Sequence, residues 1–191
     1  CHTSGSMPPP SFSLVGMGLM SAGIGAAIHL VGTWRELSPT AELIARLTGY
    51  HGFILLCILG AGGFLLPRFL GLGLRRSYQD TGAKSLVWQR AARVARLAGI
   101  AILGTYALES FGWSRVATTT RALIAVAYLT YEMPVERLRW SWKGVHWLLL
   151  TGLLCIPVGM SLAGWFPGSR LAFLHVELIG GFALITIGVA T

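Results

Sequence analysis

The chain has 191 residues, of which 54% are hydrophobic and only 12% are charged, with a formal net charge of +8. Soluble domains carry about twice that charged fraction, so the composition excludes an ordinary soluble globular protein. The basic residues gather between long apolar blocks, which indicates a membrane topology signal and argues against nucleic-acid binding.

The chain begins with CHTSGSMPPP, which has no basic segment followed by an apolar core and therefore does not read as a signal peptide. We predict that residues 1–11 form a disordered cytoplasmic tail and that residues 12–191 form one membrane domain. Apolar blocks of ~17–25 residues are long enough to cross the roughly 30 Å hydrocarbon layer as helices. A membrane β-barrel would need alternating apolar and polar residues, and none appear. We predict an all-α integral membrane bundle of six transmembrane helices, with spans at 12–32, 51–67, 97–112, 117–133, 145–165 and 171–191.

The distribution of Lys and Arg predicts the orientation of these spans. Short loops on the cytoplasmic side of a membrane are enriched in Lys and Arg. The loops after the second and fourth spans are basic and the intervening ones are poorer, which places both termini in the cytoplasm. The fourth span contains Arg121 and is the least apolar. The basic loops contain Arg68, Arg75, Arg76, Lys84, Arg90, Arg93, Arg96, Arg137, Arg139 and Lys143.

The tryptophans support the same layout, because indole rings prefer the boundary between water and lipid. Every tryptophan falls at or near a predicted span end. Trp34, Trp113 and Trp165 fall at outer ends, and Trp88, Trp140, Trp142 and Trp147 fall at inner ends.

Three of the four histidines in the spans fall on the outer side of the predicted membrane, whereas His146 opens the fifth span on the inner side. His29 lies near the outer end of the first span, His51 opens the second, and His175 lies near the start of the sixth. Glu109 and Glu177 fall in the same layer. Ionisable side chains in a bilayer are costly and commonly mark a pathway or a cofactor site. Alternatively, each histidine reaches the interface or bonds a nearby carbonyl without any ligand.

Imidazole is a good ligand for haem iron and for copper. Two facing histidines suit a six-coordinate haem, one suits a gas-binding haem with an open face, and three without a thiolate suit copper. Glu177 is then an outer partner that orients a histidine, or a proton carrier, and Glu109 has the same candidate role. Because residues two apart on a helix point in different directions, we do not expect His175 and Glu177 to bind one ion together. The chain has no Cys-x-x-Cys-His motif, which excludes covalent c-type haem attachment.

Two stretches resemble the NnrS family of bacterial haem–copper membrane proteins. Residues 50–72 read YHGFILLCILGAGGFLLPRFLGL, and residues 173–191 read FLHVELIGGFALITIGVAT. In that family one His opens a glycine-rich helix that ends in Pro and a basic residue. Another His opens a helix that runs His-x-x-x-x-Gly-Gly toward Ala-Thr-Arg. The matching positions here are His51, Gly62, Gly63, Pro67, Arg68, His175, Gly180, Gly181, Ala190 and Thr191.

The resemblance implies haem b, copper or both as cofactors, with His51 and His175 as leading ligands. His29 joins them as a third ligand from its depth alone. The resemblance also implies that the protein lies in the bacterial inner membrane and is linked to nitric oxide or nitrosative stress. Family members have about twelve spans, so we expect this chain to be half of a longer protein or a shortened relative that needs other subunits.

Two other functions fit the same sequence. A cofactor-free accessory subunit of a larger respiratory or photosynthetic membrane complex would also have glycine-rich spans, aromatic boundaries and no soluble domain. A small transporter would show interrupted helices in paired positions, and the chain has one Pro kink, at Pro157, and no convincing internal repeat. The sequence shows no nucleophile constellation, phosphate loop or paired carboxylates, so we assign no catalytic reaction and leave open whether the protein is an enzyme.

Overall fold

A computed structural model describes residues 8–72, 85–137 and 144–190. Across these ranges the regular structure is helical and contains no strand, which confirms the all-α prediction. The first helix is α1 (Phe12–Gly32), and the second rod joins α2 (Pro39–Arg46), the π-helical turn η1 (Leu47–Gly52) and α3 (Phe53–Phe69). The middle of the chain forms α4 (Leu86–Ser110), α5 (Ser114–Glu132) and the short η2 (Val135–Arg137). The last part forms α6 (Val145–Trp165), η3 (Pro167–Ser169), α7 (Arg170–His175), the π-helical η4 (Val176–Ala183) and α8 (Leu184–Ala190).

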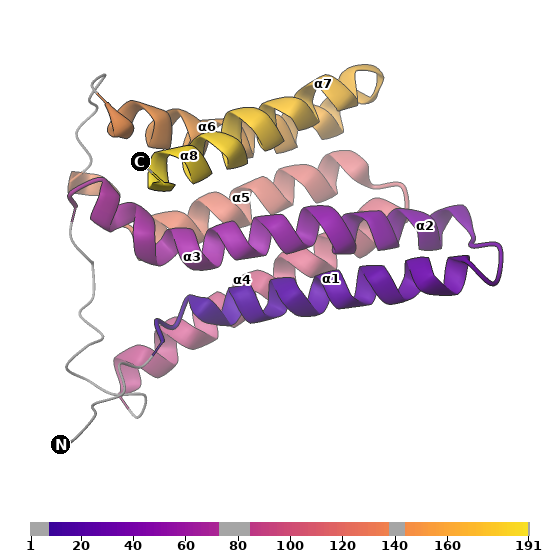
Figure 1. Ribbon diagram of the computed structural model, residues 1–191, viewed down its shortest axis with the longest axis horizontal. Coiled ribbons are helices and arrows are strands. Elements are labelled where there is room, and N and C mark those ends of the chain that lie inside the picture. Colours follow the sequence, from indigo (N-terminus) through magenta and orange to yellow (C-terminus); the bar gives the residue numbers. More distant parts are fainter. Residues whose placement is uncertain (1–7, 73–84, 138–143, 191) are drawn as a thin grey trace.

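The helices run up and down beside one another as a bundle (Figure 1). The α1–α2, α4–α5 and α6–α7 connections lie at one end, on the right of the view, and we call this end the cavity end. α1 packs on α3, α4 on α5, α5 on α6, and α6 on the rod formed by α7, η4 and α8. Segments from both halves of the chain therefore meet at the cavity end.

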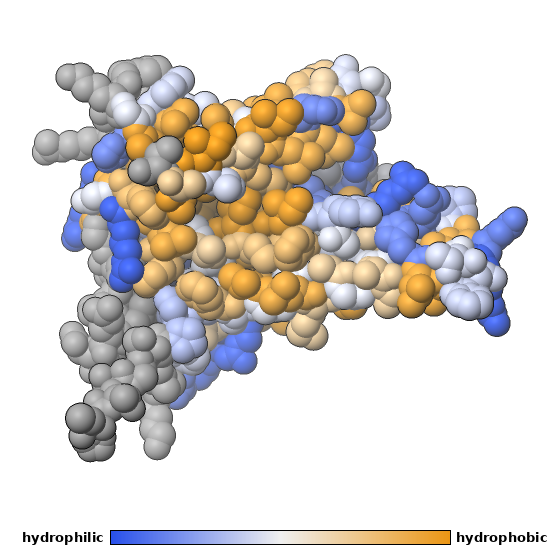
Figure 2. Space-filling view, viewed as in Figure 1, coloured by the Kyte–Doolittle hydropathy of each residue, from blue (hydrophilic) through white to orange (hydrophobic). Residues whose placement is uncertain are grey.

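The surface is that of a multi-pass membrane protein. In the part of the chain that the structure describes, five helices are long and apolar enough to cross a membrane: those over 12–32, 39–69, 86–110, 145–165 and 167–190. Figure 2 shows a broad hydrophobic band between hydrophilic ends. Many large apolar side chains are exposed, among them Met20, Leu97 and Ile179. Burying such a band in lipid removes its apolar area from water, which favours bilayer contact.

α5 completes the bundle but is less apolar than the other rods. Its first turns carry Ser114, Arg115, three threonines and Arg121. Arg121 is buried rather than exposed to lipid. The polar residue that weakens this span in the sequence therefore belongs to the interior.

Two rods begin earlier than the sequence suggested. Pro39 occupies the first helical position of α2, and the Ser38 hydroxyl accepts a hydrogen bond from the Ala41 N–H at 3.2 Å. This is a favourable helix start because the cap satisfies an N–H group that lacks a helical partner and proline needs none. As a result, His51 lies more than two turns inside a continuous rod instead of opening a helix. Similarly, α4 begins after Ser85, so the basic and apolar stretch at 85–97 is the first half of this helix.

Some expectations fall on residues outside the described ranges. These include residues 1–7 of the expected tail, and two of the inner tryptophans, Trp140 and Trp142. Pro9 and Pro10 precede α1 without helical structure.

Candidate functional site

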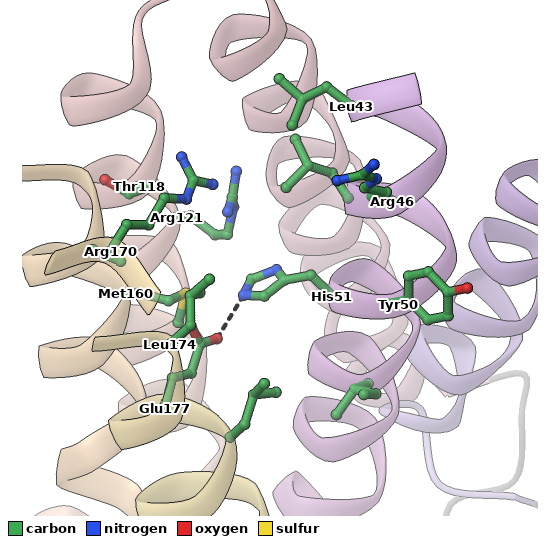
Figure 3. A pocket seen from close by; sticks show the side chains of 14 residues that line it. Leu43, Arg46, Tyr50, His51, Thr118, Arg121, Met160, Arg170, Leu174 and Glu177 are labelled. Carbon is green, nitrogen blue, oxygen red and sulfur yellow. Dashed lines mark hydrogen bonds and ion pairs between the residues drawn. The ribbon is translucent and has the colours of Figure 1, made fainter. Parts of the chain in front are cut away.

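A cavity of about 380 Å³ lies at the cavity end of the bundle (Figure 3). Side chains from α2, η1, α3, α5, α6, α7 and η4 line it. Part of the wall is apolar and is formed by Leu43, Leu47, Ile54, Met160, Leu174 and Leu178. The other part carries charged or titratable groups: Arg46, His51, Arg121, Arg170 and Glu177.

His51 bridges a hydroxyl and a carboxylate across the bundle. Its Nε2 lies 2.6 Å from Glu177 Oε1, and its Nδ1 lies 2.8 Å from the Tyr106 hydroxyl oxygen. A neutral imidazole satisfies both contacts if Nε2–H donates to the carboxylate and Nδ1 accepts from the hydroxyl. Glu177 is fully buried. The cavity therefore contains an imidazole whose orientation is fixed by η4 on one side and α4 on the other.

The two partners share an unusual local structure. His51 lies in η1 and Glu177 lies in η4, and both segments are π-helical. A π-turn inserts an extra residue, which rotates the following side chains relative to an α-helix, and such turns occur frequently at functional sites. The contacting pair therefore joins two π-helical turns, one on each rod.

Glycine permits the close approach behind Glu177. A Cβ added at Gly159 of α6 would lie 2.7 Å from the Glu177 backbone nitrogen and 2.9 Å from Phe173 O. These are backbone atoms that no side-chain rotation can move aside. Gly159 thus allows η4 to lie directly against α6 with Glu177 at the contact.

One oxygen of Glu177 has no hydrogen-bond partner among the described residues. Oε2 is buried, whereas Oε1 contacts His51. Leaving a buried acceptor unsatisfied costs ~1–3 kcal/mol, and more when it is charged. A bound cation or a donor group on a ligand would satisfy this oxygen.

A second buried cluster lies beside the first. Glu109 Oε2 accepts a hydrogen bond from Arg121 at 2.6 Å, and Glu109 Oε1 accepts one from Arg170. Arg121 also donates from Nε to Thr105 Oγ1 at 2.9 Å. Its guanidinium carbon lies 4.0 Å from the centre of the Tyr106 ring, a cation–π contact. Tyr106 thus touches both clusters and connects them.

The three histidines expected to bind a cofactor lie in three different environments. Of the three candidate histidines, His51 lines the cavity. His175 is exposed, and its Nδ1 bonds Leu171 O of its own helix at 2.7 Å. His29 lines a separate hollow with Glu36 and Glu42, and its buried Nε2 has no hydrogen-bond partner among the described residues.

The three histidines therefore do not form one ligand set. Within the described ranges, no group of three or more His, Cys, Asp or Glu side chains is placed to hold a metal ion. A copper ion held by His29, His51 and His175 does not fit this arrangement. A single imidazole facing a cavity, with a buried carboxylate beside it, does fit a haem or metal group that takes one histidine. The two candidate glutamates also have different partners. Glu177 contacts His51, whereas Glu109 contacts two arginines.

Sequence reasoning missed Tyr106, Arg121 and Arg170 as parts of the site. A signal for the arginines was present. An arginine inside an apolar span needs a buried acid, since an uncompensated charge is expensive there. Glu109 in the preceding span was the natural candidate.

Comparisons with known proteins add no assignment. No family model, no curated protein and no solved structure matches the chain. The resemblance to the NnrS family stays a prediction that rests on residues 50–72 and 173–191.

Proposed function

We propose that this chain is an NnrS-like haem- or metal-binding membrane protein whose binding centre is the His51–Glu177 pair. The observation that carries the proposal is the convergence of one imidazole and one fully buried carboxylate in a cavity of about 380 Å³. Small-molecule and cofactor sites have volumes of ~300–1,000 Å³ and mostly apolar walls with a few polar groups.

In this proposal each group has a separate task. His51 supplies the ligand nitrogen. If Nε2 binds the metal, Glu177 joins it as a second ligand and Tyr106 holds the ring at Nδ1. If Nδ1 binds the metal in place of the Tyr106 hydroxyl, Glu177 accepts the Nε2–H and orients the imidazole. The leucines of the wall exclude water. If His51 held a haem iron as its one protein ligand, the iron would supply a site for a diatomic gas.

The cellular location and the physiological role are proposed because of the resemblance to the NnrS family. They comprise the bacterial inner membrane, a cytoplasmic N-terminus, and a link to nitric oxide or nitrosative stress. Other membrane subunits, or further spans of a longer protein, would complete the assembly.

An optical titration tests the proposal. Purified protein in detergent is titrated with haemin, and the Soret band and the iron and copper contents are measured. We expect a bound-haem spectrum for the wild type that is lost in His51→Ala and altered in Glu177→Gln. The control is His175→Ala, which removes an exposed imidazole from the neighbouring rod and should leave the spectrum unchanged. A spectrum insensitive to His51→Ala would overturn the proposal.

A cofactor-free accessory subunit remains the second candidate, and one observation favours it. Both ring nitrogens of His51 already have partners within the chain, Tyr106 and Glu177. This function predicts that the wild type binds neither haem nor metal and that the His51 contacts only stabilise the bundle. The same titration therefore separates the two functions.

A further inference from the structure

Two guanidinium groups on the cavity wall share a single carboxylate. Arg121 and Arg170 both bond Glu109, each through a different carboxylate oxygen. Two positive charges against one negative charge leave the cluster with a surplus positive charge. We propose that Arg121 and Arg170 form a binding site for a planar monovalent oxyanion group, of which a carboxylate is the simplest.

The two arginines have donors to spare for such a group. A guanidinium carries five N–H donors in a planar fork. Arg121 uses Nε for Thr105 and one terminal nitrogen for Glu109. Arg170 uses one terminal nitrogen for Glu109 and reaches Ser114 Oγ with the other at a long 3.5 Å. Neither arginine therefore meets Glu109 through both arms of its fork.

The two arginines reach the cavity wall from different helices. Arg121 comes from α5 and Arg170 from α7, and both line the cavity (Figure 3). In that view their guanidinium groups lie close to each other, on the same side of His51. A ligand held near the imidazole would thus meet both forks.

Burial makes the surplus charge attractive to an anion. Arg121 is 2% exposed, so water screens its charge poorly, whereas the Arg170 side chain is 34% exposed and is screened more. The other cavity carboxylate, Glu177, contacts His51 and forms no ion pair with either arginine in the described chain, so it does not occupy their donors. Guanidinium forks bind the oxygens of carboxylates and phosphates bidentately, and the single surplus charge of the cluster suits a monovalent carboxylate better than a more highly charged phosphate.

The carboxylate-like group has two chemical sources. It is either a free small anion or the acidic side chain of a larger cavity ligand such as haem. The second source depends on the proposed function, whereas the first does not.

The first experiment uses radiolabelled formate and the full chain without cofactor. Equilibrium dialysis in detergent should give a dissociation constant for formate that is at least about tenfold higher in Arg170→Gln than in the wild type, because a charge-assisted hydrogen bond is lost. Arg115→Gln is the matched control, because it removes the same charge from an exposed position on α5 beside Trp165. It should leave the affinity within about twofold of the wild type.

Glu109→Gln separates recognition from simple damage to the fold. This variant removes the carboxylate that competes with the ligand for both guanidiniums, so formate should bind more tightly. A merely structural role of the cluster predicts weaker binding in Glu109→Gln and Arg170→Gln alike. That outcome would overturn the proposal.

The second experiment compares haemin with its dimethyl ester, which lacks the free carboxylates. If the anion belongs to the cofactor, the ester binds the wild type at least about tenfold more weakly, and Arg170→Gln removes this difference. Arg170-dependent formate binding in a chain that binds no haem leaves the anion site standing while the proposed function fails. If neither formate affinity nor the effect of esterification depends on Arg170, the proposal is wrong.

Discussion

Replacing Gly159 with alanine should push η4, which carries Glu177, away from α6. The new Cβ would lie 2.7 Å from Glu177 N, 2.9 Å from Glu177 Cβ and 2.9 Å from Phe173 O. Ordinary contacts of this kind begin at 3.4 Å, so the deficit is about 0.5–0.7 Å. Because two of the three atoms are backbone atoms, η4 has to move relative to α6.

This movement acts directly on the proposed binding centre. The His51 Nε2–Glu177 Oε1 distance of 2.6 Å has no room to shorten, and a lengthening of about 0.5–0.7 Å takes it to the outer limit of a hydrogen bond. Overpacking of this kind costs ~1–3 kcal/mol. For a chain of this size, the melting temperature should fall by roughly 2–4 °C for each kcal/mol.

The assay is thermal unfolding in detergent, followed by circular dichroism, together with the haemin titration. Gly104→Ala is the matched control, because a Cβ at Gly104 meets nothing within 4 Å. That control should be neutral or more stable by ~0.5–1 kcal/mol, since alanine favours a helix over glycine. If Gly159→Ala melts at the same temperature as Gly104→Ala and binds haemin like the wild type, the close packing described for Glu177 is refuted.

Four further variants are tested by thermal unfolding, three at buried polar groups and one at an exposed histidine. Arg121→Leu leaves Glu109 with one partner fewer and should cost ~3–5 kcal/mol, and adding Glu109→Leu should recover part of this loss, as a double-mutant cycle would measure. Equal losses in the single and double variants would contradict the buried pair. Tyr106→Phe removes the hydroxyl that bonds His51 and should cost ~1–3 kcal/mol, whereas an unchanged melting temperature would contradict that contact. His175→Ala should change stability by less than about 0.5 kcal/mol, because this side chain is exposed, and a larger loss would show that it packs inside.

The long apolar helices were predictable because hydrophobic length alone defines them. The expected spans at 12–32 and 145–165 have the same bounds as α1 and α6. The predicted second span, 51–67, was shorter than the observed rod. The reason is that α2, with the sequence PTAELIAR, is amphipathic and contains no continuous run of apolar residues. Its start at Ser38-Pro39 is nevertheless a capping signal that a search for helix starts would detect.

The candidate site was only partly predictable, for a physical reason. Charge placement gives the depth of a residue in the membrane, so His29, His51 and His175 were assigned to the same end of the bundle. Which way each side chain faces depends on the rotation of its helix, and a span that is apolar all round carries little information about its inward face. The π-turns add to this difficulty, because they shift the helical phase at both His51 and Glu177.

The measurement that tests the central claim most directly is the metal content of the protein purified from membranes. We predict about one iron or copper ion per chain in the wild type, a level retained by His175→Ala and lost in His51→Ala. A wild type without either metal, or a metal content unaffected by His51→Ala, would contradict the assignment of His51 and Glu177 as the binding centre.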